Sequence, residues 1–113
     1  MPENEFFDRD SALELVDNDE ELLQILIDSF LKENKFEKEV LENLIESGKS
    51  KEAASYVHAT KGAARQLCVE KLKSSGQALE DVLRGKTTGD IPSLVAQMFL
   101  DYEEAVGKLK IES

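Results

Sequence analysis

The sequence predicts an all-α fold, an antiparallel four-helix bundle with a short additional N-terminal helix. Only two prolines occur, Pro2 and Pro92, one towards each end of the chain. No stretch shows the alternating β-branched pattern of a strand, and apolar residues recur instead at spacings of three and four. Such stripes fit antiparallel helices that pack at small crossing angles.

The first helix is expected over residues 11–17. Ser11 and Glu14 have the spacing of a capping box, in which each side chain satisfies a free backbone N–H at the start of a helix. Asn18 and Glu21 repeat this spacing and predict the start of a second helical segment.

This second segment is expected over residues 20–47, with Gly48 ending it. Its buried face has two apolar stripes, which are Leu23, Leu26, Ile27 and Phe30, followed by Val40, Leu41 and Leu44. The stretch between them, residues 33–35, is polar. We therefore expect a bend or a break there.

Three more helices are expected. The first is capped by Ser50, and its stripe is Ala53, Val57, Thr60, Ala64 and Leu67. The stripe of the second is Val69, Leu72, Gly76, Leu79 and Leu83. A loop follows at residues 85–90. The last helix opens near Pro92, with the stripe Val95, Met98, Tyr102, Ala105 and Leu109. No repeat or interdomain linker interrupts the pattern, so we expect a single domain over residues 1–113.

Composition narrows the class of protein. Hydrophobic residues make up 41% and charged residues 34% of the 113 residues, as in soluble globular proteins. No apolar run is long enough to span a membrane, and the acidic N-terminus lacks the features of a secretory signal. A single cysteine, Cys68, cannot form an internal disulfide, which fits a cytoplasmic protein. Because the chain starts with Met1 and ends soon after the last helix, we expect a free-standing protein, and a monomer.

The charge is unevenly distributed. The net charge is −10, and residues 1–49 account for all of it, with 15 acidic and 5 basic residues. Residues 51–86 hold 7 basic and 4 acidic residues, a net of +3. A nucleic acid is therefore not the expected partner, although the basic stretch suits a smaller anion.

The basic stretch contains the only histidine of the chain. His58, Lys61, Gly62 and Arg65 lie at i, i+3, i+4 and i+7, so they share one face of a helix, beside the buried stripe. An imidazole offers a nucleophilic nitrogen at neutral pH, and two cations one and two turns further on suit phosphoryl oxygens. A glycine inside a helix costs about 1 kcal/mol relative to alanine, and its benefit here is a flat surface that another protein can approach.

Each of these residues also has an ordinary explanation. A histidine on a helix is usually a surface residue with no special role, and Lys61 and Arg65 are by default solvated charges. Gly62 could serve only the close packing of a neighbouring helix. The combination, in a bundle-like pattern, favours the functional interpretation.

The segment from His58 to Leu67, with the sequence HATKGAARQL, resembles the signature of histidine-containing phosphotransfer (HPt) domains. The resemblance extends over about the whole chain and implies a helical bundle. Two positions depart from the signature. Thr60 stands where the family usually has Leu or Ile, and its hydroxyl can bond to a carbonyl one turn earlier. Cys68 replaces the usual glycine, and we expect it to act as a small apolar core residue.

The resemblance also implies roles on the return helix. In similar HPt proteins, a Gln or Glu at the place of Glu80 reaches the phosphorylated histidine, and a basic residue can occur at the place of Arg84. Glu80 would then accept the proton of one ring nitrogen and expose the other. The alternative is a solvated i,i+4 ion pair between Glu80 and Arg84.

The implied function is that of a phosphorelay intermediate. His58 would accept a phosphoryl group from a receiver-domain aspartate or a kinase and pass it to another receiver aspartate, with Lys61 stabilising the phosphoryl charge. The partners would be response-regulator receiver domains and a sensor or hybrid histidine kinase. The chain would need no cofactor of its own, since Mg²⁺ would belong to the receiver.

Docking would bury an apolar patch from the first helix and residues 22–31, unless that helix simply covers these residues. The main rival function is a helical docking or adaptor protein that is not phosphorylated, whether HPt-like or unrelated. A di-iron bundle would need two Glu-x-x-His motifs, which one histidine excludes. No hydrolase signature and no ATP-binding segment is present, so neither a hydrolase nor a kinase is expected.

Overall fold

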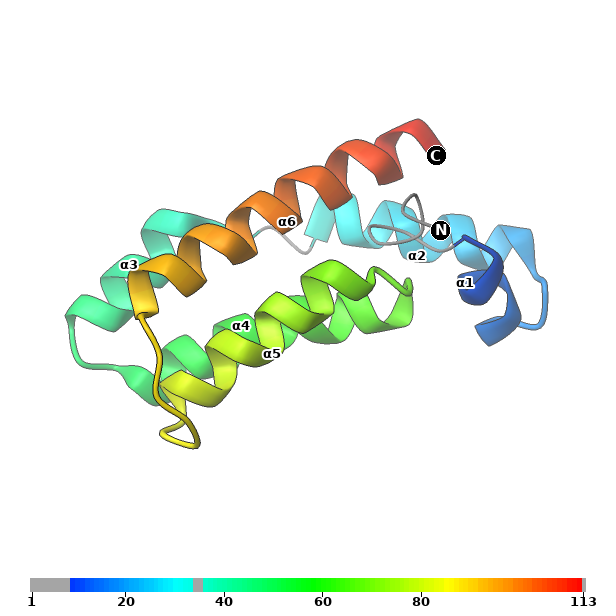
Figure 1. Cartoon of the computed structure of the whole chain (residues 1–113). Coiled ribbons are helices and arrows are strands. Elements are labelled where there is room, and N and C mark those ends of the chain that lie inside the picture. Colours follow the sequence, from blue (N-terminus) through cyan, green and yellow to red (C-terminus); the bar gives the residue numbers. More distant parts are fainter. Residues whose placement is uncertain (1–8, 34–35, 113) are drawn as a thin grey trace.

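The computed structural model describes residues 9–33 and 36–112, and these are all-α, without a strand (Figure 1). The helices are α1 (Arg9–Leu15), α2 (Glu20–Glu33), α3 (Lys38–Glu46), α4 (Ser50–Gln66), α5 (Glu70–Leu83) and α6 (Ile91–Glu112). The predicted second segment is divided between α2 and α3, which confirms the expected break. Together, α2 and α3 form the first helix of the four-helix bundle. The other three are α4, α5 and α6, and α1 is the additional short helix.

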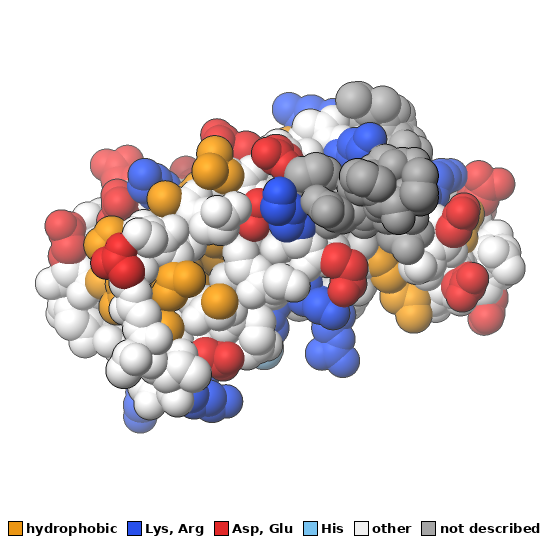
Figure 2. Space-filling model, in the orientation of Figure 1, with side chains coloured by type: hydrophobic (Ala, Val, Ile, Leu, Met, Phe, Trp, Pro, Cys, Tyr) orange, Lys and Arg blue, Asp and Glu red, His pale blue; other side chains and the backbone are white. Residues whose placement is uncertain are grey.

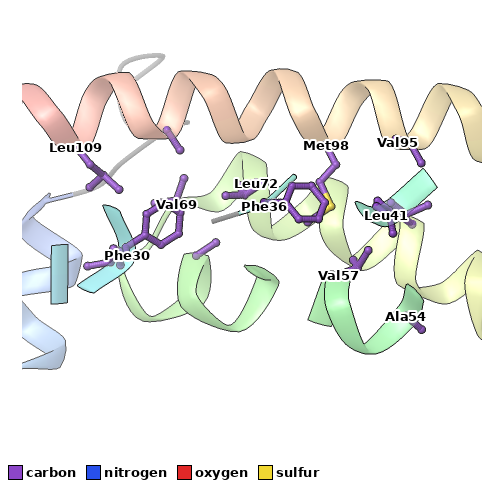
Figure 3. Packing of buried hydrophobic residues seen from close by; sticks show 14 of the residues in the cluster. Phe30, Phe36, Leu41, Ala54, Val57, Val69, Leu72, Val95, Met98 and Leu109 are labelled. Atoms are coloured by element: carbon purple, nitrogen blue, oxygen red, sulfur yellow. The ribbon is translucent and has the colours of Figure 1, made fainter. Parts of the chain in front are cut away.

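The helices pack around one apolar core. Consecutive helices α3, α4, α5 and α6 contact one another in turn, and α6 also returns to α2. Figure 3 shows Met98 and Leu109 pointing from α6 into the interior, where Phe36 and Leu72 lie. All five members of the predicted α4 stripe are buried, including Thr60, whose side chain is the only polar one among them.

The break between α2 and α3 is held by an aromatic cluster. Phe36 is 4% exposed, and its ring stacks on Phe99 of α6 at 4.4 Å and on Tyr56 of α4 at 5.5 Å between centroids. The Tyr56 hydroxyl also accepts a hydrogen bond from the backbone N–H of Glu37 at 2.8 Å. An aromatic side chain buried at the joint thus fixes where the two half-helices meet.

Three predicted N-caps were wrong, although the predicted start of the second segment at Glu20 is confirmed. The first helix is Arg9–Leu15 rather than 11–17, and Ser11 lies within it. Asn18 has a positive φ of 61°, which does not suit an N-cap, and Asp19 takes that role by accepting a hydrogen bond from the N–H of Leu22 at 3.1 Å. Ser50 is the first residue of α4 and not its cap; the N-cap is Lys49, whose side chain makes no capping bond.

The second predicted stripe of the long segment also needs a correction. Leu41 is fully buried, but Val40 is 39% exposed. Leu44, three residues after Leu41, packs against the core as predicted, so Val40 lies at the edge of the face that α3 buries.

Four helices end in the same way, with a residue in the left-handed conformation. The first is α1, which is followed by Asp17 with φ of 54°. Gly48 after α3 and Gly85 after α5 have φ of 75° and 78°, and Cys68 after α4 has φ of 56°. At each end, the next residue's N–H bonds to a carbonyl five residues back, as in a Schellman motif. Cys68 packs against the core, as expected, but it does so from the edge. It is half-buried and occupies a backbone position that favours glycine.

Candidate functional site

The imidazole of His58 is presented to solvent by the packing of α4. The neighbouring residues Val57 and Thr60 are buried, so the helix turns the intervening position outward. The side chain of His58 is 58% exposed. Both the nucleophilic group and access to it are therefore present on this face.

A buried carboxylate on α5 meets this histidine. Nδ1 of His58 lies 3.1 Å from Oε2 and 3.2 Å from Oε1 of Glu80. The side chain of Glu80 is only 7% exposed, and it also contacts Nζ of Lys61 at 2.9 Å and Nε of Arg84 at 2.8 Å. One carboxylate thus joins three of the residues that the sequence singled out.

The charge state of Glu80 decides how the ring is protonated. Burial by itself raises the pKa of this carboxyl, but hydrogen bonds from Lys61, Arg84 and His58 outweigh burial and lower the pKa to about 2. At neutral pH the carboxylate is ionised and only accepts hydrogen bonds, so Nδ1 of His58 is the donor. The neutral ring then carries its free lone pair on Nε2.

Lys61 is turned inward in this structure. Its Nζ donates to Oε1 of Gln77 at 2.9 Å as well as contacting Glu80, and its side chain is only 12% exposed. Two of the three donors of the ammonium are therefore engaged by α5. The sequence placed this cation beside His58, and the structure shows that it reaches the histidine through Glu80.

The two glycines near the site differ in what surrounds them. A Cβ built on Gly62 would meet no atom within 4 Å, so packing inside this chain does not require glycine there. A Cβ on Gly76 would lie 3.2 Å from Cβ of Lys61 and 3.2 Å from Cε of Met98. It is Gly76, not Gly62, that allows α4 and α5 to approach closely.

The two arginines are placed differently. Arg84 is one turn after Glu80 and forms the i,i+4 ion pair with it, while the same carboxylate also reaches His58. Arg65 is exposed at the end of α4 and has no ion-pair partner among the residues that the structure describes. The structure brings Arg84 into the cluster and leaves Arg65 outside it.

Sequence reasoning missed Gln77. Its Nε2 donates to Oδ1 of Asp81 at 2.8 Å, which points its amide oxygen at Lys61. Gln77 lies three residues before Glu80, so both share one face of α5, and this spacing could have drawn attention to Gln77. The sequence alone, however, did not show that α4 and α5 bring Gln77 to Lys61.

The surface of the protein has basic parts and apolar parts. Figure 2 shows Lys and Arg side chains projecting from the lower edge of the view, the edge formed by α4 and α5 in Figure 1. Three apolar side chains stay exposed on and near α1 and α2: Leu15 at 64%, Leu22 at 41% and Ile25 at 61%. The first helix therefore does not cover all the apolar residues of this region.

Residues 9–33 and 36–112 contain neither a candidate metal centre nor a candidate membrane span. No group of three or more His, Cys, Asp and Glu side chains there is placed to hold a metal ion. None of the described helices combines the length and the apolar character that crossing a bilayer requires.

Comparison with known proteins relates the chain to a family. The family model described as the Hpt domain matches residues 13–109, which include all of the cluster around Glu80. Searches of curated proteins and of solved structures gave no significant match.

Proposed function

The chain belongs to the Hpt domain family, and on this premise we propose that His58 is the residue that carries the phosphoryl group. Membership implies histidine phosphotransfer in a phosphorelay, by a module without a kinase domain. The observation that best supports His58 is its contact with Glu80, because a carboxylate at 3.1 Å from Nδ1 leaves Nε2 as the nucleophile.

The proposed reaction starts from an aspartyl phosphate. Nε2 of His58 attacks the phosphorus atom, an N–P bond forms, and the O–P bond to the aspartate breaks to release a carboxylate. The ring then holds both a proton on Nδ1 and a phosphoryl group on Nε2, and it gains positive charge. Glu80 stabilises this charge through its contact with Nδ1. The reverse sequence delivers the group to a second aspartate.

The cations act around this step. Glu80 with Lys61 and Arg84 carries a net charge of +1, which favours an incoming phosphoryl group. The third donor of the Lys61 ammonium is available for a phosphoryl oxygen, and the exposed Arg65 adds positive charge two turns from His58. The Mg²⁺ of the reaction belongs to the receiver partner.

We also propose which surface the receiver contacts. Hpt domains interact with receiver domains and histidine kinases, and such docking needs exposed apolar area next to the reacting group. We assign this role to the exposed side chains of Leu15, Leu22 and Ile25, and the bare Cα of Gly62 would let a partner's backbone approach.

The experiment is incubation of the purified protein with a panel of phosphorylated receiver domains. The expected result is an acid-labile label on this chain that is absent from His58→Gln. Lys61→Ala should slow the transfer while leaving the helix content unchanged. Label that survives His58→Gln would place the phosphoryl group elsewhere, and no label with any receiver would favour a docking function without phosphorylation.

A further inference from the structure

Gln77 makes two hydrogen bonds that point in opposite directions. Its Nε2 donates to Oδ1 of Asp81 at 2.8 Å, one turn further along α5, and its Oε1 accepts from Nζ of Lys61 at 2.9 Å, across to α4. A carboxylate can only accept, so Asp81 fixes which end of the amide is the oxygen. The oxygen therefore faces the lysine.

The same local pair recurs elsewhere without the lysine. Gln24 donates to Asp28 at 3.0 Å in α2, and Gln97 donates to Asp101 at 3.1 Å in α6, both again at i,i+4. Among these three glutamines, only Gln77 accepts a hydrogen bond from a lysine of another described helix. Its second bond thus goes beyond what helix stabilisation needs.

We propose that Gln77 is a positioning residue of the phosphotransfer site: it holds the Lys61 ammonium against Glu80, and through Glu80 it keeps the His58 ring protonated on Nδ1. The inference rests on the proposed function of His58. The chain of contacts is continuous, from Asp81 through Gln77, Lys61 and Glu80 to Nδ1 of His58, with every link between 2.8 and 3.2 Å.

The physical reason is the flexibility of lysine. Its four-carbon stem has many rotamers, and a single contact with Glu80 fixes only one direction of the ammonium. A neutral acceptor at Gln77 adds a second fixed direction without adding negative charge beside the incoming phosphoryl group. When Gln77 cannot accept, the ammonium spends more time away from Glu80. The carboxylate is then held by one donor fewer, and it is less firmly fixed in the orientation that faces Nδ1 of His58.

The test compares Gln77→Met, which keeps the shape but loses the acceptor, with Gln77→Glu, which keeps an acceptor for Lys61. Gln97→Met is the matched control, because it removes a Gln–Asp pair far along the chain from the lysine. The first readout is the tautomer of His58 from the ¹⁵N shifts of its ring in the unphosphorylated protein. The second is the rate at which phosphoramidate, a small phosphodonor, phosphorylates His58.

In Gln77→Met, we expect a smaller population with the proton on Nδ1 and phosphorylation slower by about threefold to tenfold. Gln77→Glu should keep the tautomer, and Gln97→Met should keep both the tautomer and the rate. An unchanged tautomer in Gln77→Met, or the same change in Gln97→Met, would overturn the inference. Because the tautomer is measured without any phosphoryl group, this result is independent of whether His58 is phosphorylated.

Discussion

Nδ1 of His58 lies 3.1 Å from Oε2 of Glu80, although the two residues are 22 positions apart and belong to different helices. This contact gives the two ring nitrogens different surroundings. One is tied to a buried carboxylate, and the other, on an exposed side chain, is the one to which the proposed function assigns the transfer. Glu80 should also contribute to the free energy of unfolding, because His58, Lys61 and Arg84 all contact its carboxylate.

The stability of the fold should depend on the ionisation of Glu80. Its pKa is about 2 in the folded protein against an ordinary value of 4.5. The unfolded chain therefore binds the proton more readily, so the stabilisation is complete above about pH 4.5 and is lost as the pH falls towards 2. A difference of this size corresponds to about 3 kcal/mol.

Urea denaturation of the wild type and Glu80→Gln between pH 6 and pH 2 measures this contribution. All other carboxyl groups titrate in both proteins, so the difference between the two free energies of unfolding isolates Glu80. We expect the advantage of the wild type to shrink by about 3 kcal/mol over this range. If the free energies of unfolding of the two proteins changed in parallel with pH, the lowered pKa of Glu80 would be contradicted.

Gly62→Ala should stabilise the fold and at the same time slow phosphotransfer from a receiver domain. A Cβ at Gly62 has open space around it, so alanine should raise the free energy of unfolding by up to about 1 kcal/mol. The same substitution should slow phosphotransfer from a receiver, whose backbone then meets a methyl group. Phosphorylation by phosphoramidate should be unaffected, since this donor is small.

Gly107→Ala in α6 is the matched control, because a Cβ there also meets nothing within 4 Å. It should give the same gain in stability and leave both transfer rates unchanged. Equal receiver-dependent rates in Gly62→Ala and Gly107→Ala would show that Gly62 has no role in docking.

Cys68 should be replaceable by glycine with a gain in stability. Its φ of 56° is strained for a residue with a Cβ, and Gly48 and Gly85 occupy the corresponding place at two other helix ends. We expect Cys68→Gly to be more stable than Cys68→Ala by about 1 kcal/mol in thermal or urea unfolding. The opposite order, which holds inside a helix, would show that the left-handed conformation is not maintained in solution.

Ile25 should contribute to receiver binding. It is 61% exposed on α2, and Leu100 on α6, at 56%, is the matched control. We expect Ile25→Ser to weaken receiver binding by about tenfold, measured by titration calorimetry, with Leu100→Ser close to the wild type. Phosphoramidate should label both variants at the wild-type rate. Equal weakening in both would show that the docking surface is not confined to α1 and α2.

Features that depend on one helix at a time could be predicted from the amino-acid sequence. Apolar spacing predicted the all-α fold, and the polar stretch at residues 33–35 predicted the break between α2 and α3. The outward position of His58, beside Lys61 and Gly62, followed from the same period, because 3.6 residues per turn fix which positions share a face. The motif around His58 also led to the family.

Features that depend on the register between helices could be found only from the way the helices pack. The spacing of Glu80 allowed a contact with His58 or a solvated pair with Arg84, and packing produced both contacts at one carboxylate. The inward turn of Lys61 and its bond to Gln77 depend on how closely α4 and α5 approach at Gly76. Helical periodicity is local, whereas this distance is set by side chains from three helices at once, which no single stretch of sequence contains.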